Sequence, residues 1–165
     1  MGNYKAAYRK STRMRGTDLA RLGGYTLAVA AGSALTMTEE LHAGTTISLD
    51  TAAGSTVTLP ASTGQGAVYR FRVSVLATSN NHIIKVANAT DVMQGIVFTS
   101  DDTSDAVFAF RTAASSDTIT LNRTTTGSVQ LGEWIELTDI AAGVFHVKAL
   151  LANSGAQATP FSATV

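Results

Sequence analysis

Cysteine is absent from this 165-residue chain, proline occurs only twice, and aromatic residues make up 7% of it. Without cysteine the chain has no disulfide framework and no thiolate metal site, which leaves its compartment open. The most apolar run, residues 25–37, is interrupted by Gly32, Ser33 and two threonines. It falls short of the roughly 18–20 continuous apolar residues that a membrane helix needs, so we expect no membrane partner. Its basic leader is also too long, and its centre too weakly apolar, for the secretory signal that this arrangement could otherwise indicate.

Threonine and apolar residues are what the sequence has in abundance. Apolar residues make up 45% of the chain, and it contains 24 threonines. Residues branched at Cβ fit the pleated surface of a sheet and lose rotamer freedom in a helix. The length suits one domain with a tail. The composition therefore predicts a folded, strand-rich body.

Short alternating segments recur along that body and are separated by clusters of Gly, Asn, Asp, Ser and Thr. Such spacing is typical of a β-sandwich or barrel. We predict an all-β domain over 25–165, an antiparallel β-sandwich resembling a jelly roll, with no fixed-period repeat of a solenoid and with helix expected only in a turn at 17–22. The predicted strands are 26–31, 34–38, 45–50, 55–60, 68–75, 82–87, 94–99, 106–111, 117–122, 133–139 and 144–151.

Period-two alternation indicates which face of each strand is buried. In 68–75 the residues Tyr69 and Phe71 share one face, and Arg70 and Arg72 share the other. Neighbouring residues such as Trp134 and Ile135 must point to opposite faces, so one of that pair is expected to meet another subunit or the N-terminal arm. The predicted buried residues are Tyr69, Phe71, Ile119, Trp134, Ile135, Phe145 and Val147.

Positive charge is concentrated at the start of the chain. Residues 1–21 hold six of the 12 Lys and Arg residues against one acid, whereas the whole chain has a formal net charge of zero. A split of this kind indicates that an arm, residues 1–24, is attracted to something acidic: nucleic acid, a membrane surface, another protein or the acidic body itself. We expect no nucleic-acid partner, because the body would repel a polyanion and offers no aromatic platform, although tyrosines lie among the cations. The cations of the arm are Lys5, Arg9, Lys10, Arg13, Arg15 and Arg21.

Catalytic motifs are missing from the sequence. There is no G-x-S-x-G elbow and no cysteine nucleophile, and His42, His82 and His146 lie at the edges of different predicted strands. Gly64-Gln65-Gly66 leads into a strand rather than a helix, so it is interpreted as a turn and not as a phosphate-binding loop. We therefore expect no enzyme activity and no cofactor.

The acidic loop at 100–105 invites comparison with a calcium site. It lacks the glycine and the final carboxylate of an EF-hand loop, so a solvated turn is expected. Asp101 and Asp105 still leave a surface metal site open as an alternative. The sequons at Asn88 and Asn122 are interpreted as strand-end and turn chemistry.

Several stretches resemble a family of small virion proteins of tailed bacteriophages, the capsid decoration (cement) and head-fibre proteins. The resemblance covers about residues 42–162 and leaves out the arm. Its most specific parts are Asp117-Thr-Ile-Thr-Leu-Asn122, the turn Thr124-Thr-Thr-Gly127, and the segment from Trp134 to Val147 together with Ala158-Thr-Pro-Phe161. These motifs are structural: turn glycines, strand residues and a tryptophan anchor.

The resemblance implies a β-sandwich, often a homotrimer, on the outside of an icosahedral shell, with the major capsid protein of that shell as its partner. The basic arm would then lie across a neighbouring subunit or the shell, and Trp134, Ile135 and Phe145 would form core or subunit contacts. The alternative is a head- or tail-fibre module that binds host surface carbohydrate. That function needs an exposed aromatic surface, whereas Trp134 is predicted to be core.

Overall fold

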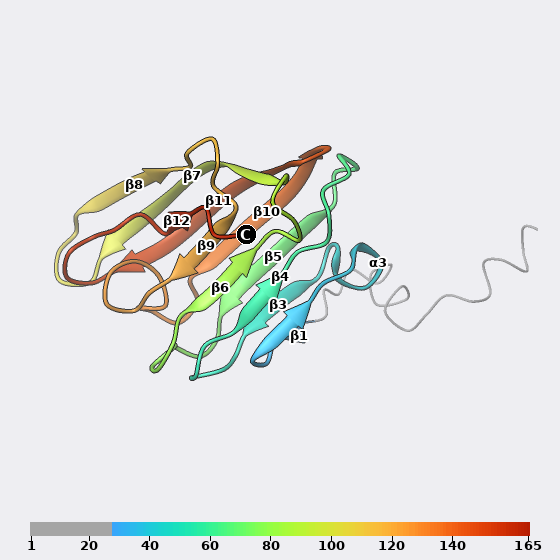
Figure 1. Cartoon of the computed structure of the whole chain (residues 1–165). Helices are drawn as coiled ribbons and strands as arrows, with labels where there is room; N and C mark the ends of the chain where they lie inside the picture. The colour runs from blue at the N-terminus through green and yellow to red at the C-terminus, as the bar shows by residue number, and fades with distance from the viewer. Residues whose placement is uncertain (1–27) are drawn as a thin grey trace, which may run out of the picture.

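Two β-sheets face each other across an apolar core in the computed structural model, which describes residues 28–165 (Figure 1). The predicted arm, with Lys5, Arg9, Lys10, Arg13, Arg15 and Arg21, and the helical turn predicted at 17–22 lie outside the described residues. The larger sheet has the order β1 (Ala28–Ala30), β3 (Thr46–Leu49), β5 (Val68–Val73), β10 (Trp134–Ala141), β11 (Val144–Asn153), β7 (Val92–Asp101) and β8 (Val107–Arg111). The smaller sheet has the order β12 (Phe161–Ser162), β9 (Thr118–Leu121), β6 (His82–Lys85), β4 (Thr56–Thr58) and β2 (Ala34–Thr36).

All eleven predicted strands are present, so the all-β prediction is confirmed, and β12 is an additional strand. The predicted antiparallel pairing is not what the sheets show. Five of the ten strand pairs are parallel: β1 with β3, β3 with β5, β2 with β4, β4 with β6, and β7 with β11. Both sheets are therefore mixed.

The first six strands alternate between the two sheets, which explains much of the parallel pairing. The chain crosses from the larger to the smaller sheet three times, from β1 to β2, from β3 to β4 and from β5 to β6. Each crossing follows the same direction as the previous one, so its strands lie beside the previous strands and parallel to them. Ala28 pairs with Thr46 and Thr46 with Arg70, at spacings of 18 and 24 residues. These unequal spacings leave no fixed-period repeat, although the segment winds as three coils.

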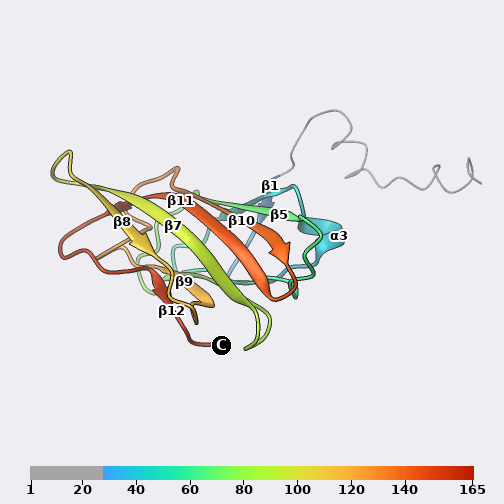
Figure 2. The ribbon, with the colours of Figure 1, turned by 90° about the horizontal axis from the view of Figure 1, so that it is seen from above.

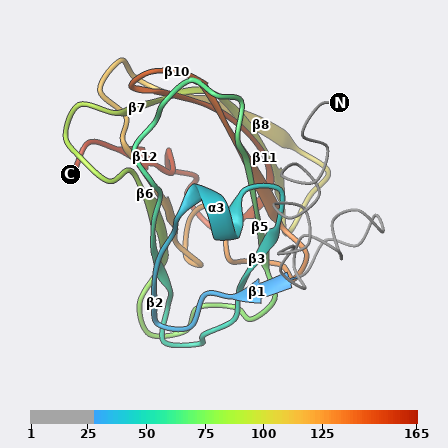
Figure 3. The ribbon, with the colours of Figure 1, turned by 90° about the vertical axis from the view of Figure 1, so that its right-hand side faces the viewer.

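Helix α3 (Glu39–His42) is a single turn at one end of the sandwich, between the two sheets in the end-on view (Figure 3). The sequence predicted helix only before Gly24, so α3 was not expected. Four residues are too few for an apolar period to be recognised. His42, expected at a strand edge, is instead buried in this helix, where Nδ1 lies 3.0 Å from the backbone nitrogen of Thr38.

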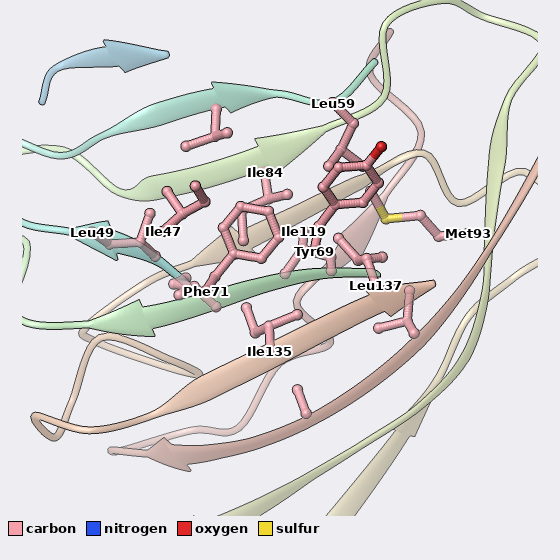
Figure 4. Packing of buried hydrophobic residues seen from close by; sticks show 14 of the residues in the cluster. Ile47, Leu49, Leu59, Tyr69, Phe71, Ile84, Met93, Ile119, Ile135 and Leu137 are labelled. Atoms are coloured by element: carbon pink, nitrogen blue, oxygen red, sulfur yellow. The ribbon is translucent and has the colours of Figure 1, made fainter. Parts of the chain in front are cut away.

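The core is built from the inward rows of both sheets (Figure 4). Tyr69 and Phe71 of β5 are 1% exposed, and Phe145 of β11 is fully buried, with its ring edge-on to Tyr69 at 6.3 Å between centroids. Six of the seven residues predicted to be buried are buried; the exception is Trp134. The confirmed six are Tyr69, Phe71, Ile119, Ile135, Phe145 and Val147.

Trp134 points out of the sandwich, and its prediction as a core residue is wrong. It is 37% exposed, whereas its neighbour Ile135 is 1% exposed. Alternation placed the two side chains on opposite faces but did not say which face was inside. Of the two, Ile135 belongs to the core, and Trp134 is the one available to a partner.

Candidate functional site: the outer face of the larger sheet

The outer face of the seven-stranded sheet carries a row of large apolar side chains that crosses three strands. Trp134 of β10 pairs with Leu150 of β11, and Leu150 pairs with Phe98 of β7. Directly paired residues point to the same side of a sheet, so these three side chains lie next to one another, and we call them the apolar row. Leu150 is 52% exposed and Phe98 is 49% exposed. Figure 2 shows β10, β11 and β7 running side by side along this sheet.

More apolar surface adjoins the apolar row. Ile96 lies two residues before Phe98 on the same face of β7 and is 43% exposed, and Val107 of β8 is also exposed. Leu131, in the loop before β10, lines a shallow hollow of about 200 Å³ together with Leu150. An exposed cluster of this kind on one face is typical of an interaction surface, whereas apolar side chains scattered singly over a protein are not.

A row of charged side chains lies immediately beside the apolar row. Glu136 of β10 pairs in register with Arg70 of β5 and with Lys148 of β11. Its carboxylate contacts Lys148 Nζ at 2.9 Å and Arg70 Nε at 3.0 Å. Hydrogen bonds from Lys148 and Arg70 outweigh the burial of Glu136 and lower the pKa of its carboxyl. In these three groups, called the charged row here, one carboxylate is shared by two cations, so the row keeps a net positive charge.

The charge of this face differs from that of the rest of the described chain. Residues 28–165 have six cations and 11 acids. Four of those cations, Arg70, Arg72, Arg111 and Lys148, are exposed on strands of this face, and Glu136 is their only acidic partner in register. Arg72 pairs with Trp134 at one end of the apolar row. This face therefore has apolar side chains at its centre and cations around them, whereas the rest of the described chain is acidic.

His42, His82 and the Ser62–Asp139 pair make structural hydrogen bonds. His82 is fully buried: Ser55 N–H donates to Nδ1 at 3.0 Å, and Nε2 donates to the Val75 carbonyl at 2.8 Å. Ser62 donates its hydroxyl to Asp139 at 2.6 Å. That carboxylate also accepts bonds from the loop of Ser62, Thr63 and Gly64, so it holds the turn that the sequence predicted there. Neither His42 nor His82 has a side-chain hydroxyl among its partners in the described chain.

The first carboxylate of the acidic loop, Asp101, is hydrogen-bonded to groups of the protein itself. Asp101 accepts hydrogen bonds from the backbone N–H and the hydroxyl of Thr103, and these bonds lower its pKa to about 2. Asn153 also donates to Asp101, at 3.1 Å. Within residues 28–165 no group of three or more His, Asp and Glu side chains is placed to hold a metal ion. No helix of the described part is long and apolar enough to cross a membrane.

Sequence reasoning missed Phe98, Leu150 and Ile96 as surface residues. A signal was present: Ile96-Val97-Phe98 and Ala149-Leu150-Leu151 are apolar at three successive positions, so one face of each strand must present apolar side chains away from the core. No protein-family model matches this chain, and comparisons with curated proteins and with solved structures found no match either. The likeness to phage virion proteins therefore stays a prediction.

Proposed function

We propose that this chain is a structural virion protein that binds the outside of a bacteriophage shell as a decoration (cement) protein. The sequence resemblance over residues 42–162 suggests this role. The observation that carries the proposal is the apolar row on the outer face, because Trp134, Leu150 and Phe98 are exposed next to one another instead of being scattered singly over the surface. The sandwich of two sheets is compatible with a jelly-roll-like relative, although half of its strand pairs are parallel.

The outer face suits attachment to a folded protein surface. Tryptophan and arginine are enriched among the residues that dominate binding energy, especially where they are surrounded by contacts that exclude water. Burial of the apolar row would provide the favourable free energy, at about 25 cal/mol for each Å² removed from water. The surrounding cations would favour a shell surface with acidic groups and would raise the association rate.

The basic arm and a trimeric assembly complete the proposal. An arm with six cations adds many weak contacts to an acidic shell surface, and three linked copies raise the effective concentration of the second and third arms once the first is bound. We propose the major capsid protein as the partner. Exposed ion pairs are screened by salt, so the arm's contribution should weaken as ionic strength rises.

Binding of the full chain to shells that lack it tests the proposal. Trp134→Ala should reduce affinity at least about tenfold, the effect expected for an anchor residue. Leu41→Ala, a change of a similarly exposed apolar residue on α3, is the matched control and should bind like the wild type. Charge reversal at Arg9, Lys10, Arg13 and Arg15 should weaken binding more at low salt than at high salt. Unchanged binding by the Trp134 and charge-reversal variants would contradict the proposal.

A head- or tail-fibre module that binds carbohydrate is the second candidate. The exposure of Trp134 favours it, because an aromatic side chain on a sheet surface is what such a module needs and the sequence analysis expected none. Trp134 is the only tryptophan, so its fluorescence reports on this surface alone. A response to host-surface oligosaccharides, with no response to shells, would support the fibre function over decoration.

A further inference from the structure

The two sheets have four edge strands, and β8 differs from the other three. β1 and β2 have three residues each and β12 has two, whereas β8 has five. Beyond β12, the backbone N–H groups of Thr164 and Val165 are bonded to Asp117. Proteins protect sheet edges by keeping them short, charged or interrupted by proline. β8 is the longest edge in the described chain, and it has no proline and a single charge.

The hydrogen-bond pattern fixes which backbone groups of β8 face away from the sheet. Asp101 N–H donates to the carbonyl of Ala106 at 2.9 Å, and Thr112 N–H donates to the carbonyl of Gly95 at 3.1 Å. Alternate residues of an antiparallel strand bond to the same neighbour. In the register of β7 with β8, the even-numbered residues from 106 to 112 therefore bond to β7. The N–H and C=O groups that point outward belong to Val107, Ala109 and Arg111.

The side chains of β8 leave this edge accessible. Val107 is 66% exposed, and Ala109 and Arg111 are also exposed, on the same face as the apolar row. Phe108 and Phe110 are half-buried on the opposite face, and Phe110 packs against the core. The strand is therefore held in an extended conformation by β7 while its free side remains open. Figure 1 shows β8 beside β7 at the far end of the sheet from β1.

We propose that β8 pairs antiparallel with β8 of a second copy of this chain, about a two-fold axis through Ala109. In this register Ala109 faces its own copy, and Val107 faces Arg111 of the other copy. Both pairs consist of residues whose backbone groups point outward, so each pair can exchange two hydrogen bonds. The hydrogen-bonding pattern of the strand is thus self-complementary.

Side-chain chemistry selects the same register. Arg111 lies opposite Val107, which avoids like charges, and Phe108 lies opposite Phe110, which gives an aromatic pair on each side of the axis. An axis through Arg111 would place two arginines against each other. An axis through Val107 would leave Arg111 outside the ladder. A single register therefore satisfies the backbone, the charges and the aromatic rings.

The β8 contact is independent of the proposed shell binding and of the proposed trimer. A two-fold contact joins chains in pairs, whereas a trimer forms around a three-fold axis. In a decorated shell, the β8 contact would link one trimer to the next. It also extends the larger sheet across both copies and places the two apolar rows on one continuous surface.

Disulfide trapping tests the contact, because the natural chain contains no cysteine. Facing Cα atoms in a hydrogen-bonded antiparallel pair are about 5.5 Å apart, within the roughly 4.4–6.8 Å that a disulfide spans. Full-length Ala109→Cys at micromolar concentration should form a covalent dimer under mild oxidation. Ala114→Cys is the matched control: it is also exposed, but its two copies would lie on opposite sides of the axis. It should remain uncrosslinked.

Ala109→Lys provides a second test that needs no oxidation. It places two ammonium groups opposite each other, so dimers measured by sedimentation should decrease at least tenfold in association constant and recover partly at high salt. Ala109→Gln, similar in length but uncharged, should associate more strongly than the lysine variant. Equal crosslinking at positions 109 and 114, or no crosslinking at 109, would overturn the proposal. Shell binding that persists in that case would leave the proposed function standing.

Discussion

His82 shows how a single buried residue links the stability of this protein to pH. Its two ring nitrogens bond to Ser55 N–H and to the Val75 carbonyl, which fixes the neutral tautomer with the proton on Nε2. Burial lowers the pKa of His82, because a charged imidazole would lose its hydration and because Nδ1 already accepts a hydrogen bond. The folded state therefore takes up this proton less readily than the unfolded state does.

We expect the His82 contribution to stability to be complete above the unfolded-state pKa of about 6.5 and to decrease as the pH falls below it. The decrease can reach about 1.4 kcal/mol for each pH unit. Urea unfolding between pH 8 and pH 5.5 measures it. His82→Gln should lower stability at pH 8 but should remove this part of the pH dependence. Parallel pH profiles of the variant and the wild type would contradict the assignment.

For single residues, the sequence predicted those of the core better than those of the surface. Tyr69, Phe71 and Phe145 were identified because alternation is unambiguous where polar and apolar residues take turns. Trp134 and Ile135 are both apolar, so alternation could not decide which one is buried. The difference follows from strand pairing, which brings Trp134 beside Leu150 on the outer face.

Among the elements, the loop between β4 and β5 is held by Asp139 of β10 and, at Ser62 N–H, by Asp91. Asp139 is 2% exposed and accepts bonds from the Ser62 hydroxyl at 2.6 Å, from Thr63 N–H at 2.9 Å and from Gly64 N–H at 2.7 Å. Burial opposes its charge, but these bonds outweigh burial and lower its pKa. Gly64 has φ +81°, and a Cβ there would lie 3.0 Å from the Ala141 Cα. The loop therefore packs directly against the β10–β11 turn.

Asp139→Asn should destabilise the fold by about 2–3 kcal/mol. The amide replaces one acceptor oxygen with a donor, so at least one hydrogen bond to a charged group is lost and a backbone N–H in the loop is left without its partner. Chemical denaturation at pH 7 measures the change. Asp102→Asn, in the exposed loop after β7, is the control and should stay within about 0.5 kcal/mol of the wild type. Equal stabilities of the two variants would contradict the role of Asp139.

The positions of the strands were predictable from the sequence, but whether neighbouring strands run parallel or antiparallel was not. Turn residues and alternation located the strands from β1 to β11 because both signals are local. Parallel pairing of β3 with β5 or β7 with β11 depends on how the chain crosses between sheets, and period-two alternation is the same for parallel and antiparallel strands. Gly95 in β7 illustrates this limit: a Cβ there would lie 1.9 Å from the Val147 carbonyl oxygen of β11, a contact that only the pairing reveals.

In the whole molecule, charge and apolar surface are unequally distributed. Most acids of the described chain lie in α3, in loops and in the buried carboxylates of Asp117, Glu133 and Asp139, whereas the outer face of the larger sheet combines the apolar row with four cations. The basic arm precedes β1, which is an edge of the same sheet. In the proposed function, this face is the surface through which the protein binds a phage shell.

Quenching of Trp134 fluorescence by acrylamide tests whether the outer face is covered on the shell. Trp134 is the only tryptophan, and acrylamide is uncharged, so the neighbouring Arg72 does not bias its approach. We expect acrylamide to quench the free protein readily, and binding to shells to protect Trp134 and to shift its emission to shorter wavelength. Equal quenching of the free protein and of the protein bound at saturation would show that the outer face stays exposed to solvent on the shell, and would contradict the account.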